Sequence, residues 1–281
     1  MTTPEPFDRK LRRLHRDRAS PLWKDHAFLQ QRIAEELIER LADVQRSFSS
    51  VLMLGHGTAE LSSTLAAKQM AIAHADPGFR FARSDKGVQC DEDRLPFRDA
   101  SFDLIFSVGL FDTTNDLPGA LTLARRCLKP DGLFLAGFPG AGSLPVLKRA
   151  MLDADIVQNA ANARIHPQID VRAAGDLLGR AGFALPVADR ESLDVRYSSL
   201  TSLIADLRGS GLSSLLNGPS LSKSARDIAE KSFASLGDNG RTTERFEIIF
   251  LTAWAPSPDQ PKPAKRGSGS VSLSEAFKKS D

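Results

Sequence analysis

The sequence predicts an α/β protein built on a doubly wound, mainly parallel sheet. Apolar runs typical of buried strands alternate with segments of helical periodicity between residues 51 and 138. The first run, Val51–Leu54, ends in a glycine-rich turn, as a parallel strand does where it leads into a helix. A last apolar run, FEIIFLTAW at 246–254, predicts a further strand after a mostly helical stretch.

The N-terminal part predicts helices. Phe7, Leu11 and Leu14 have the spacing of one face of a short basic helix over 7–18, and a second apolar pattern predicts a helix from 28 to 44. We interpret residues 1–46 as a helical cover that precedes the core.

The core domain is predicted over residues 47–255. Strands are expected at 51–54, 70–74, 102–108 and 133–138, and helices at 60–68 and 117–128, the second closed by the turn sequence KPDG at 129–132. Helices follow at 144–161 and 171–181, then an extended segment at 184–196 and a helical insertion at 198–240 before the last strand. This insertion is the expected place for substrate recognition. Residues 256–281 are rich in proline and glycine and predict a flexible tail.

Composition excludes several classes of protein. Hydrophobic residues make up 41% and charged residues 26% of the 281 positions, which is typical of an ordinary globular chain. The net charge is +2, and basic ends (six basic and three acidic residues in 1–18, five and three in 256–281) flank a mildly acidic core, so no nucleic-acid partner is expected. Cys90 and Cys127 are too few for a disulfide framework. We find neither a signal peptide nor a membrane-spanning run, and expect a cytoplasmic protein.

Three features predict a nucleoside-type cofactor. The turn Gly55, His56, Gly57 lets the backbone approach a ligand at the start of a helix. Asp76, at the end of the second strand, has the spacing of a carboxylate that accepts hydrogen bonds from both ribose hydroxyls. Asp91 offers an acceptor to an adenine amino group. Glu92 and Ser107 complete the candidate set, although a glycine pair and a lone aspartate also occur as ordinary turns and caps.

These residues stand in a familiar order. GHG at 55–57, Ala75-Asp76, Asp91-x-x-x-Leu-Pro-Phe, Phe102-Asp-Leu and Leu128-Lys-Pro-Asp-Gly together resemble the class I S-adenosylmethionine-dependent methyltransferases of type 11. The resemblance implies a Rossmann-like seven-stranded sheet whose last strand is antiparallel, with S-adenosylmethionine over strands one, two and four. Two positions depart from the pattern: Met53 replaces the usual acidic residue, and Phe111-Asp112-Thr113-Thr114 replaces His-Trp.

A second resemblance extends to both ends of the chain. FDRKLR at 7–12, RIHPQID at 164–170, LLGRAGF at 177–183, DLR at 206–208 and KRGSGSVS at 265–272 are similar to the methyltransferase-like respiratory complex I assembly factors, which are protein-arginine hydroxylases in mitochondria. The resemblance implies modification, by methylation or hydroxylation, of an arginine in a complex I subunit, with peripheral membrane contact. The alternative is a non-catalytic assembly protein that keeps the fold with a degenerate cofactor motif.

Asp112 is the candidate catalytic residue. It follows the strand at 102–108 and is placed to orient or deprotonate an amine or guanidinium, although a loop or capping aspartate fits the same position. His74 and Asp76 with a distant His166 have the spacing of an iron site, but Asp76 already has a ribose role and we predict no metal.

The basic N-terminal helix admits more than one interpretation. We expect Arg9, Arg12, Arg13, Arg16 and Arg18 to form a solvated face, with a partner-binding face or a lid over the cofactor cleft as alternatives. His15 and His26 are expected to face solvent, and both cysteines to be small buried residues.

Overall fold

A computed structural model describes residues 5–160, 162–216 and 218–260 of the chain. The predicted tail therefore lies mostly outside the described residues. In the described part, no helix is both long and apolar enough to cross a membrane.

The centre of the molecule is one seven-stranded sheet in the order β3-β2-β1-β4-β5-β7-β6. The strands are β1 (Ser50–Leu54), β2 (Ala71–Asp76), β3 (Val88–Gln89), β4 (Phe102–Val108), β5 (Leu128–Pro139), β6 (Ala184–Tyr197) and β7 (Thr242–Trp254). Neighbouring strands are parallel except that β7 is antiparallel to both β5 and β6. This is the Rossmann-like sheet, with an antiparallel last strand, that the sequence resemblance implies.

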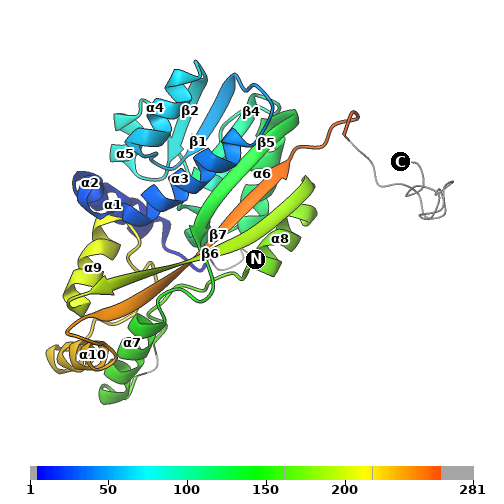
Figure 1. The fold of residues 1–281 in the computed structure, drawn as a ribbon. Helices are drawn as coiled ribbons and strands as arrows, with labels where there is room; N and C mark the ends of the chain where they lie inside the picture. Colours follow the sequence, from blue (N-terminus) through cyan, green and yellow to red (C-terminus); the bar gives the residue numbers. More distant parts are fainter. Residues whose placement is uncertain (1–4, 161, 217, 261–281) are drawn as a thin grey trace, which may run out of the picture.

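Helices cover both faces of the sheet, which explains the apolar runs within its central strands (Figure 1). On one face, α3 (Phe28–Ala42) and α4 (Ala59–Ala67) pack against Val51 and Met53. On the other, α6 (Leu117–Cys127) and α8 (Val171–Arg180) pack against Leu52 and Leu54. Alternate side chains of β1 thus enter opposite cores. The short α5 (Phe79–Ser84) connects β2 to β3.

The turn sequence at 129–132 falls inside β5 and shifts its pairing with β4. Phe102 pairs with Leu128, but Leu104 pairs with Leu133, so the residues between them bulge out of the ladder. Asp131 takes the left-handed conformation there, with φ 62°.

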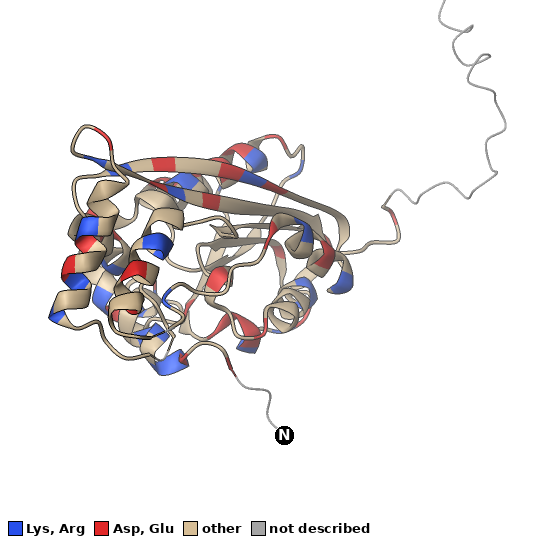
Figure 2. Ribbon diagram, turned by 90° about the horizontal axis from the view of Figure 1, so that it is seen from below, with Lys and Arg blue, Asp and Glu red and all other residues tan. Residues whose placement is uncertain are grey.

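A helical lobe extends from one end of the sheet (Figure 1). It consists of α7 (Pro145–Val157), α9 (Leu200–Gly209) and α10 (Lys223–Ser235), packed against the ends of β6 and β7. These two strands run 14 and 13 residues and pair continuously from Val187 with Thr252 to Tyr197 with Thr242. Figure 2 shows acidic and basic residues together along this ribbon.

Two predicted helices are shorter than expected. The helical stretch at 200–236 is two helices, because α9 ends at Gly209, Gly211 takes φ 75°, and α10 begins only at Lys223. The helix predicted to reach residue 161 ends at Val157.

The N-terminal segment forms α1 (Arg9–Ala19), the 3-10 turn η1 (Ser20–Leu22) and α2 (Trp23–His26). Asp8 caps α1 by accepting hydrogen bonds from the Lys10 and Leu11 amides at 2.8 and 3.0 Å. Contacts of α1 with α5 and α9 place it between the sheet and the lobe. It therefore lies near the edge where β1, β2 and β4 end.

Candidate functional site

The glycine turn follows β1 at the carboxyl edge of the sheet. Gly55 has φ 90°, a conformation that favours glycine, and its amide donates to the Ala75 carbonyl of β2 at 2.8 Å. A Cβ at Gly55 would lie 2.9 Å from the Val108 carbonyl oxygen, whereas at Gly57 the nearest atom would be 3.6 Å away. The two glycines thus differ: Gly55 is required by the backbone, and Gly57 leaves space.

His56, between these glycines, is held by α5. Its Nδ1 lies 2.7 Å from Asp85 Oδ2, and its ring stacks on Phe81 with centroids 4.6 Å apart. Burial opposes the charge of Asp85, but the contact with His56 outweighs it and lowers the pKa of that carboxyl. Met53 is buried below the turn. His56 therefore holds the turn in place. It does not substitute for the acidic residue that Met53 replaces.

The predicted acidic residues converge on the same edge. Asp76 ends β2, and Asp91 and Glu92 follow β3, which pairs with β2 at Asp76 and Gln89. All three are buried, with exposures of 2%, 1% and 2%. Ser107 lies in β4 opposite Leu54, and its buried hydroxyl has no hydrogen-bond partner among the described residues. The fold thus brings every predicted cofactor residue to one strand-end surface.

In the structure, arginine side chains of α1 bind these carboxylates. Arg16 binds both oxygens of Asp76, with Nε–Oδ1 2.7 Å and Nη2–Oδ2 2.6 Å. Arg12 binds Glu92 at 2.7 and 3.1 Å. Arg13 and Arg9 approach Asp91 Oδ2 at 2.7 and 3.1 Å, and Arg9 also binds both oxygens of Asp93.

The expectation of a solvated arginine face is therefore wrong. Positions 9, 12, 13 and 16 share one face of α1, and that face points into the protein, where Arg12 and Arg16 are 5% and 4% exposed. Arg18, on the other side of the helix, remains exposed. A helix face of four arginines is stable inside because each guanidinium meets a carboxylate.

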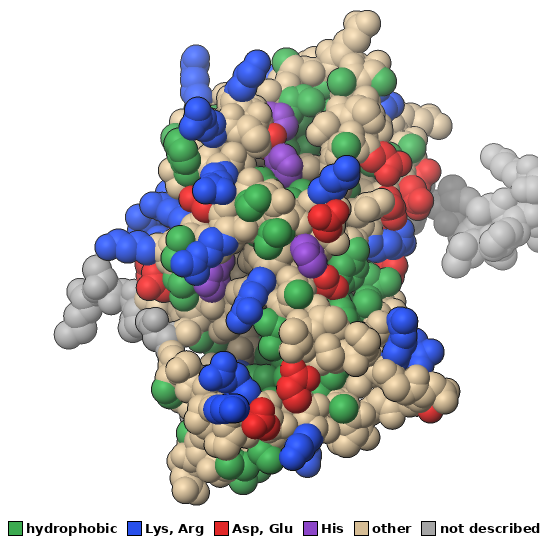
Figure 3. All heavy atoms as spheres, turned by 90° about the vertical axis from the view of Figure 1, so that its left-hand side faces the viewer, with side chains coloured by type: hydrophobic (Ala, Val, Ile, Leu, Met, Phe, Trp, Pro, Cys, Tyr) green, Lys and Arg blue, Asp and Glu red, His purple; other side chains and the backbone are tan. Residues whose placement is uncertain are grey.

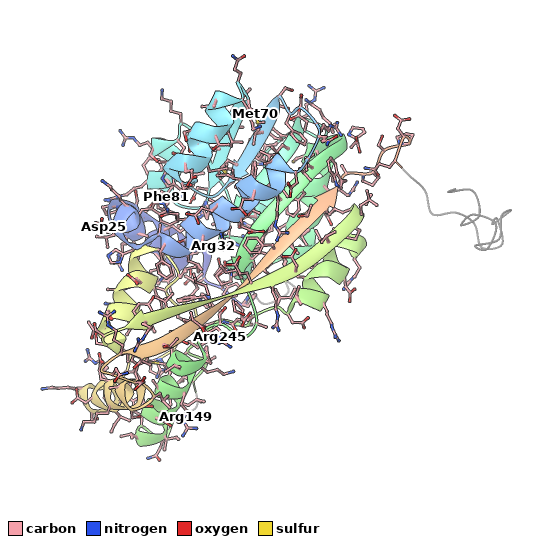
Figure 4. The ribbon with its side chains drawn as sticks, viewed as in Figure 1. Asp25, Arg32, Met70, Phe81, Arg149 and Arg245 are labelled. Atoms are coloured by element: carbon pink, nitrogen blue, oxygen red, sulfur yellow. The ribbon has the colours of Figure 1, made fainter. Side chains whose placement is uncertain are left out.

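Aromatic rings complete the environment of Arg16. Its guanidinium lies 4.8 Å from the ring centroid of Phe81 and 5.6 Å from that of Trp23. Figure 4 marks Phe81 at the place where α5 faces α1 and α2. For Arg12, burial works against the charge, but Glu92 outweighs it and raises the pKa of the guanidinium.

Asp112 lies on the turn η3 (Phe111–Thr113) after β4. Its Oδ1 is buried without a hydrogen-bond partner in the described structure. Burial raises the pKa of Asp112 to about 7, although the charge of Arg12 opposes the shift. Arg12 stabilises the same turn, donating to the Leu110 carbonyl at 3.0 Å and to the Thr113 hydroxyl at 3.1 Å.

A cavity of about 270 Å³ opens beside Asp112, between the sheet edge and the lobe. Most of its lining residues are apolar. They include Leu147 of α7, Ile204 and Leu207 of α9 and Phe246 of β7, and others, such as Leu144, Ile165 and Leu212, lie in the connections between elements. Its polar lining includes Asp112, Ser143, Arg164, His166, Gln168 and Arg208. Figure 3 shows the neighbouring face, where basic side chains alternate with apolar patches. None of Gly55, Gly57, Asp76 and Asp91 lines this cavity.

The cavity wall includes a segment that we did not predict as part of the site. Arg164, Ile165 and His166 lie in irregular structure between α7 and α8. Arg164 is paired with the buried Asp155 at 2.7 Å. His166 Nε2 accepts from the Leu215 amide at 2.7 Å, and burial lowers the pKa of the ring to about 4. The sequence marks this segment only through the family resemblance of RIHPQID at 164–170 and through His166 as a distant iron ligand, and neither predicts a cavity wall.

Two other expectations concerned histidine and cysteine. His26 is not free in solvent, because its Nδ1 lies 2.7 Å from Asp206, and His15 is half-buried, which lowers its pKa. Burial raises the pKa of the Cys90 thiol to about 12 and that of Cys127 to about 11, which makes both poor nucleophiles. In the residues that the structure covers, no group of three His, Cys, Asp or Glu side chains could hold a metal ion.

Comparison with known proteins agrees with this architecture. Residues 52–136 match the family model described as a methyltransferase domain. The chain is 31% identical to the mitochondrial arginine-hydroxylase NDUFAF5 of Danio rerio, over 97% of this chain and 89% of the relative. It is 29% identical to the malonyl-[acyl-carrier protein] O-methyltransferase of Methylovorus sp., over 85% and 86% of the two chains.

Solved structures support the fold. A methyltransferase structure from Bacillus halodurans has a TM-score of 0.54 at 14% identity, covering 80% of this chain and 99% of the other. The YcgJ protein of Bacillus subtilis has a TM-score of 0.53 at 16% identity, covering 80% and 98%. The chain therefore has the S-adenosylmethionine-dependent methyltransferase fold.

Proposed function

Because this chain belongs to the family of the arginine-hydroxylase NDUFAF5, which is built on the methyltransferase fold, we propose that it modifies an arginine side chain of a protein. The proposed cofactor is S-adenosylmethionine, held at the carboxyl edge of β1, β2 and β4. The proposed acceptor site is the cavity beside Asp112.

The residues at this edge suit a nucleoside cofactor. Asp91 Oδ1 is buried and has no hydrogen-bond partner in the described structure, so it can accept from an adenine amino group. Asp76 offers two carboxylate oxygens at the end of β2, where a ribose would lie. Gly57, where a Cβ would meet nothing closer than 3.6 Å, leaves room beside the turn for the methionine part. Glu92 is less suitable, because Arg12 holds both its oxygens.

The unpartnered oxygen of Asp112 is the observation that carries the proposal for the acceptor. It lies where the apolar cavity meets the carboxylate-lined edge. An arginine side chain has the matching form, a chain of methylenes that ends in a planar donor group. Leu147 and Phe246 would contact the methylenes, and Asp112 would accept from the guanidinium. Arg164 does not oppose this charge, because Asp155 neutralises it.

The side chains of the protein would act mainly by positioning the acceptor relative to the cofactor. When bound, S-adenosylmethionine supplies an electrophilic methyl group, so a protein that aligns the acceptor and excludes water needs no obligatory base. Asp112, with a pKa of about 7, is half ionised near neutral pH and can orient the guanidinium or take its proton. Arg12 holds the turn that carries Asp112.

We further propose a complex I subunit as the protein partner and the cytoplasm as the compartment. The names of the arginine-hydroxylase relatives support the arginine target, and their name includes a mitochondrial location. Both cysteines are free, as in a reducing compartment. Residues 1–46 would act as a cover and the segment 198–240 as part of acceptor recognition, since α9 lines the cavity.

Two measurements test the proposal. Calorimetry measures whether the full chain binds S-adenosylhomocysteine, the product that S-adenosylmethionine leaves after methyl transfer. Mass spectrometry of complex I subunits from wild-type and deletion strains asks whether one arginine loses a methyl or an oxygen mass. Binding together with a lost modification supports the proposal, and the mass distinguishes methylation from hydroxylation. An unchanged set of arginine masses would contradict it.

A non-catalytic assembly protein is the second candidate. Two observations favour it: Met53 replaces the acid expected in the first motif, and α1 fills the cofactor edge. This candidate predicts no binding of S-adenosylhomocysteine at millimolar concentration. It also predicts that Asp112→Asn supports complex I assembly as well as the wild-type chain does.

A further inference from the structure

We infer that α1 is an internal competitor of the cofactor: Arg16 and a ribose bind both oxygens of Asp76 in mutually exclusive states, while Arg13 and Arg9 hold α1 to the neighbouring Asp91. The inference rests on the proposed cofactor site and concerns what must move before that site can be used. It identifies Arg16 and Arg13 as the residues that hold the site closed.

The contacts of Asp76 use three of the about four acceptor positions of its carboxylate, too many to leave room for both ribose hydroxyls. Oδ1 accepts from Arg16 Nε at 2.7 Å and from the Gly78 amide at 2.6 Å, and Oδ2 accepts from Arg16 Nη2 at 2.6 Å. Trp23 and Phe81 flank the guanidinium of Arg16. The space in front of the carboxylate is therefore filled by a side chain, and a ribose can take these oxygens only after Arg16 leaves.

Asp91 is held on one side only. Its Oδ2 is bound by Arg13 and Arg9, while its buried Oδ1 lies 3.8 Å from Arg12 Nη1 and has no hydrogen bond within the described structure. An unsatisfied carboxylate oxygen at 1% exposure is costly. The closed state thus leaves one acceptor unused that an adenine amino group would satisfy. The carboxylates at this edge are thus bound either by the arginines of α1, in the closed state, or by the cofactor.

The contacts at the two ends of α1, and its short connection to α2, would let the helix move as a unit. At its start, the Phe7 amide and carbonyl are bound by Asn115, at 2.8 and 3.0 Å. Beside its end, Asp17 accepts from the Arg80 amide of α5 at 2.8 Å. Its connection to α2 is the short turn η1, which contains Pro21. Rotation about η1 would withdraw Arg13 and Arg16 together with Arg9 and Arg12, once the contacts of Asp17 and Asn115 and the ion pairs of the arginine face are released.

Mutual exclusion lowers the apparent affinity for the cofactor by the fraction of molecules that are open. Removing the arginines that hold α1 closed raises this fraction and tightens binding. The test compares S-adenosylhomocysteine binding by the wild-type full chain, the double variant Arg13→Gln/Arg16→Gln, and the control Arg18→Gln. The control removes a charge from the exposed face of the same helix.

We expect the double variant to bind at least about tenfold more tightly than the wild type, and the control to bind as the wild type does. Equal affinity of the double variant and the wild type would overturn the inference while leaving the cofactor proposal intact. Absence of binding by all three proteins would overturn both. Weaker binding by the double variant, with an unchanged circular dichroism spectrum, would show that the arginines assist the cofactor, which contradicts competition.

A second measurement uses the unmodified chain, so it does not depend on the folding of the variant. Hydrogen exchange of the amides in residues 9–19 is followed with and without saturating S-adenosylhomocysteine. Competition predicts faster exchange in α1 when the ligand is bound, because its carboxylate partners are taken. Slower exchange in α1 would mean that the helix closes over the ligand and would overturn the inference.

Discussion

Arg16 in α1 and Asp76 at the end of β2 form a two-point ion pair, with both carboxylate oxygens within 2.7 Å of the guanidinium. Sixty residues separate them in sequence. The pair joins the N-terminal helix to the strand end that the sequence marks as the ribose site. Stability and cofactor access therefore depend on the same contact.

Asp76→Ala should lower the free energy of unfolding by about 3–5 kcal/mol, because it leaves Arg16 buried without its partner. Urea unfolding of the full chain measures this loss. The matched control is Asp99→Ala, which breaks the exposed pair with Arg126, whose side chain is 50% accessible, and should cost less than about 1 kcal/mol. Similar losses for the two variants would show that the buried pair contributes no more than a surface pair.

Gly55→Ala should destabilise the protein by more than about 1 kcal/mol, since φ is 90° and the new Cβ would lie 2.9 Å from a carbonyl oxygen. Gly57→Ala is the control, because a Cβ there meets nothing closer than 3.6 Å. Thermal unfolding compares the two. If Gly55→Ala unfolds at the wild-type temperature, the conformation of the turn is not the one described.

Asp112 should make stability depend on pH. Its pKa is about 7 in the folded protein and about 4 when unfolded, so the folded state binds more protons between these values. Its contribution therefore favours folding below pH 4 and is lost as the pH rises toward 7, with a slope of at most about 1.4 kcal/mol per pH unit. Asp112→Asn should remove this slope in urea titrations at pH 5, 6 and 7. Parallel pH profiles for variant and wild type would refute the shift.

Ile204→Trp should fill the acceptor cavity from α9 and reduce modification of the protein substrate at least about tenfold, with unchanged binding of S-adenosylhomocysteine. Ile156→Trp on α7 is the control, because that side chain is 70% exposed and outside the cavity lining. Mass spectrometry of the modified arginine gives the readout. Full modification by Ile204→Trp would place the acceptor elsewhere.

Much of the fold follows from local sequence. β1, β4 and β5 each contain an apolar run, at 51–54, 104–106 and 133–138, because both faces of the sheet are covered, and this pattern is visible without a structure. The break between α9 and α10 was not predicted, although residues 210–222 contain Gly211, Gly218 and Pro219, which disfavour a helix. The backbone turns there because of Gly211, which only the packed structure places at φ 75°.

The site was predictable in part. Asp76 and Asp91 were found because they follow strands, and strand ends of a parallel sheet meet at one edge. The role of Arg12 and Arg16 was missed because charge in an amphipathic helix usually marks the solvent face. Their spacing of four residues and the acids at the strand ends were both visible in the sequence. Only the three-dimensional arrangement shows that the arginines of α1 face the acidic residues at the strand ends.

The long β6–β7 ribbon has a mechanical consequence. The acceptor cavity is lined from one side by residues at the sheet edge, such as Asp112, and from the other by α9 in the lobe. Sheet and lobe share two continuously paired strands rather than a flexible loop. We expect the lobe to move relative to the sheet by bending of this ribbon, so that the stiffness of two paired strands would limit how far the cavity can widen.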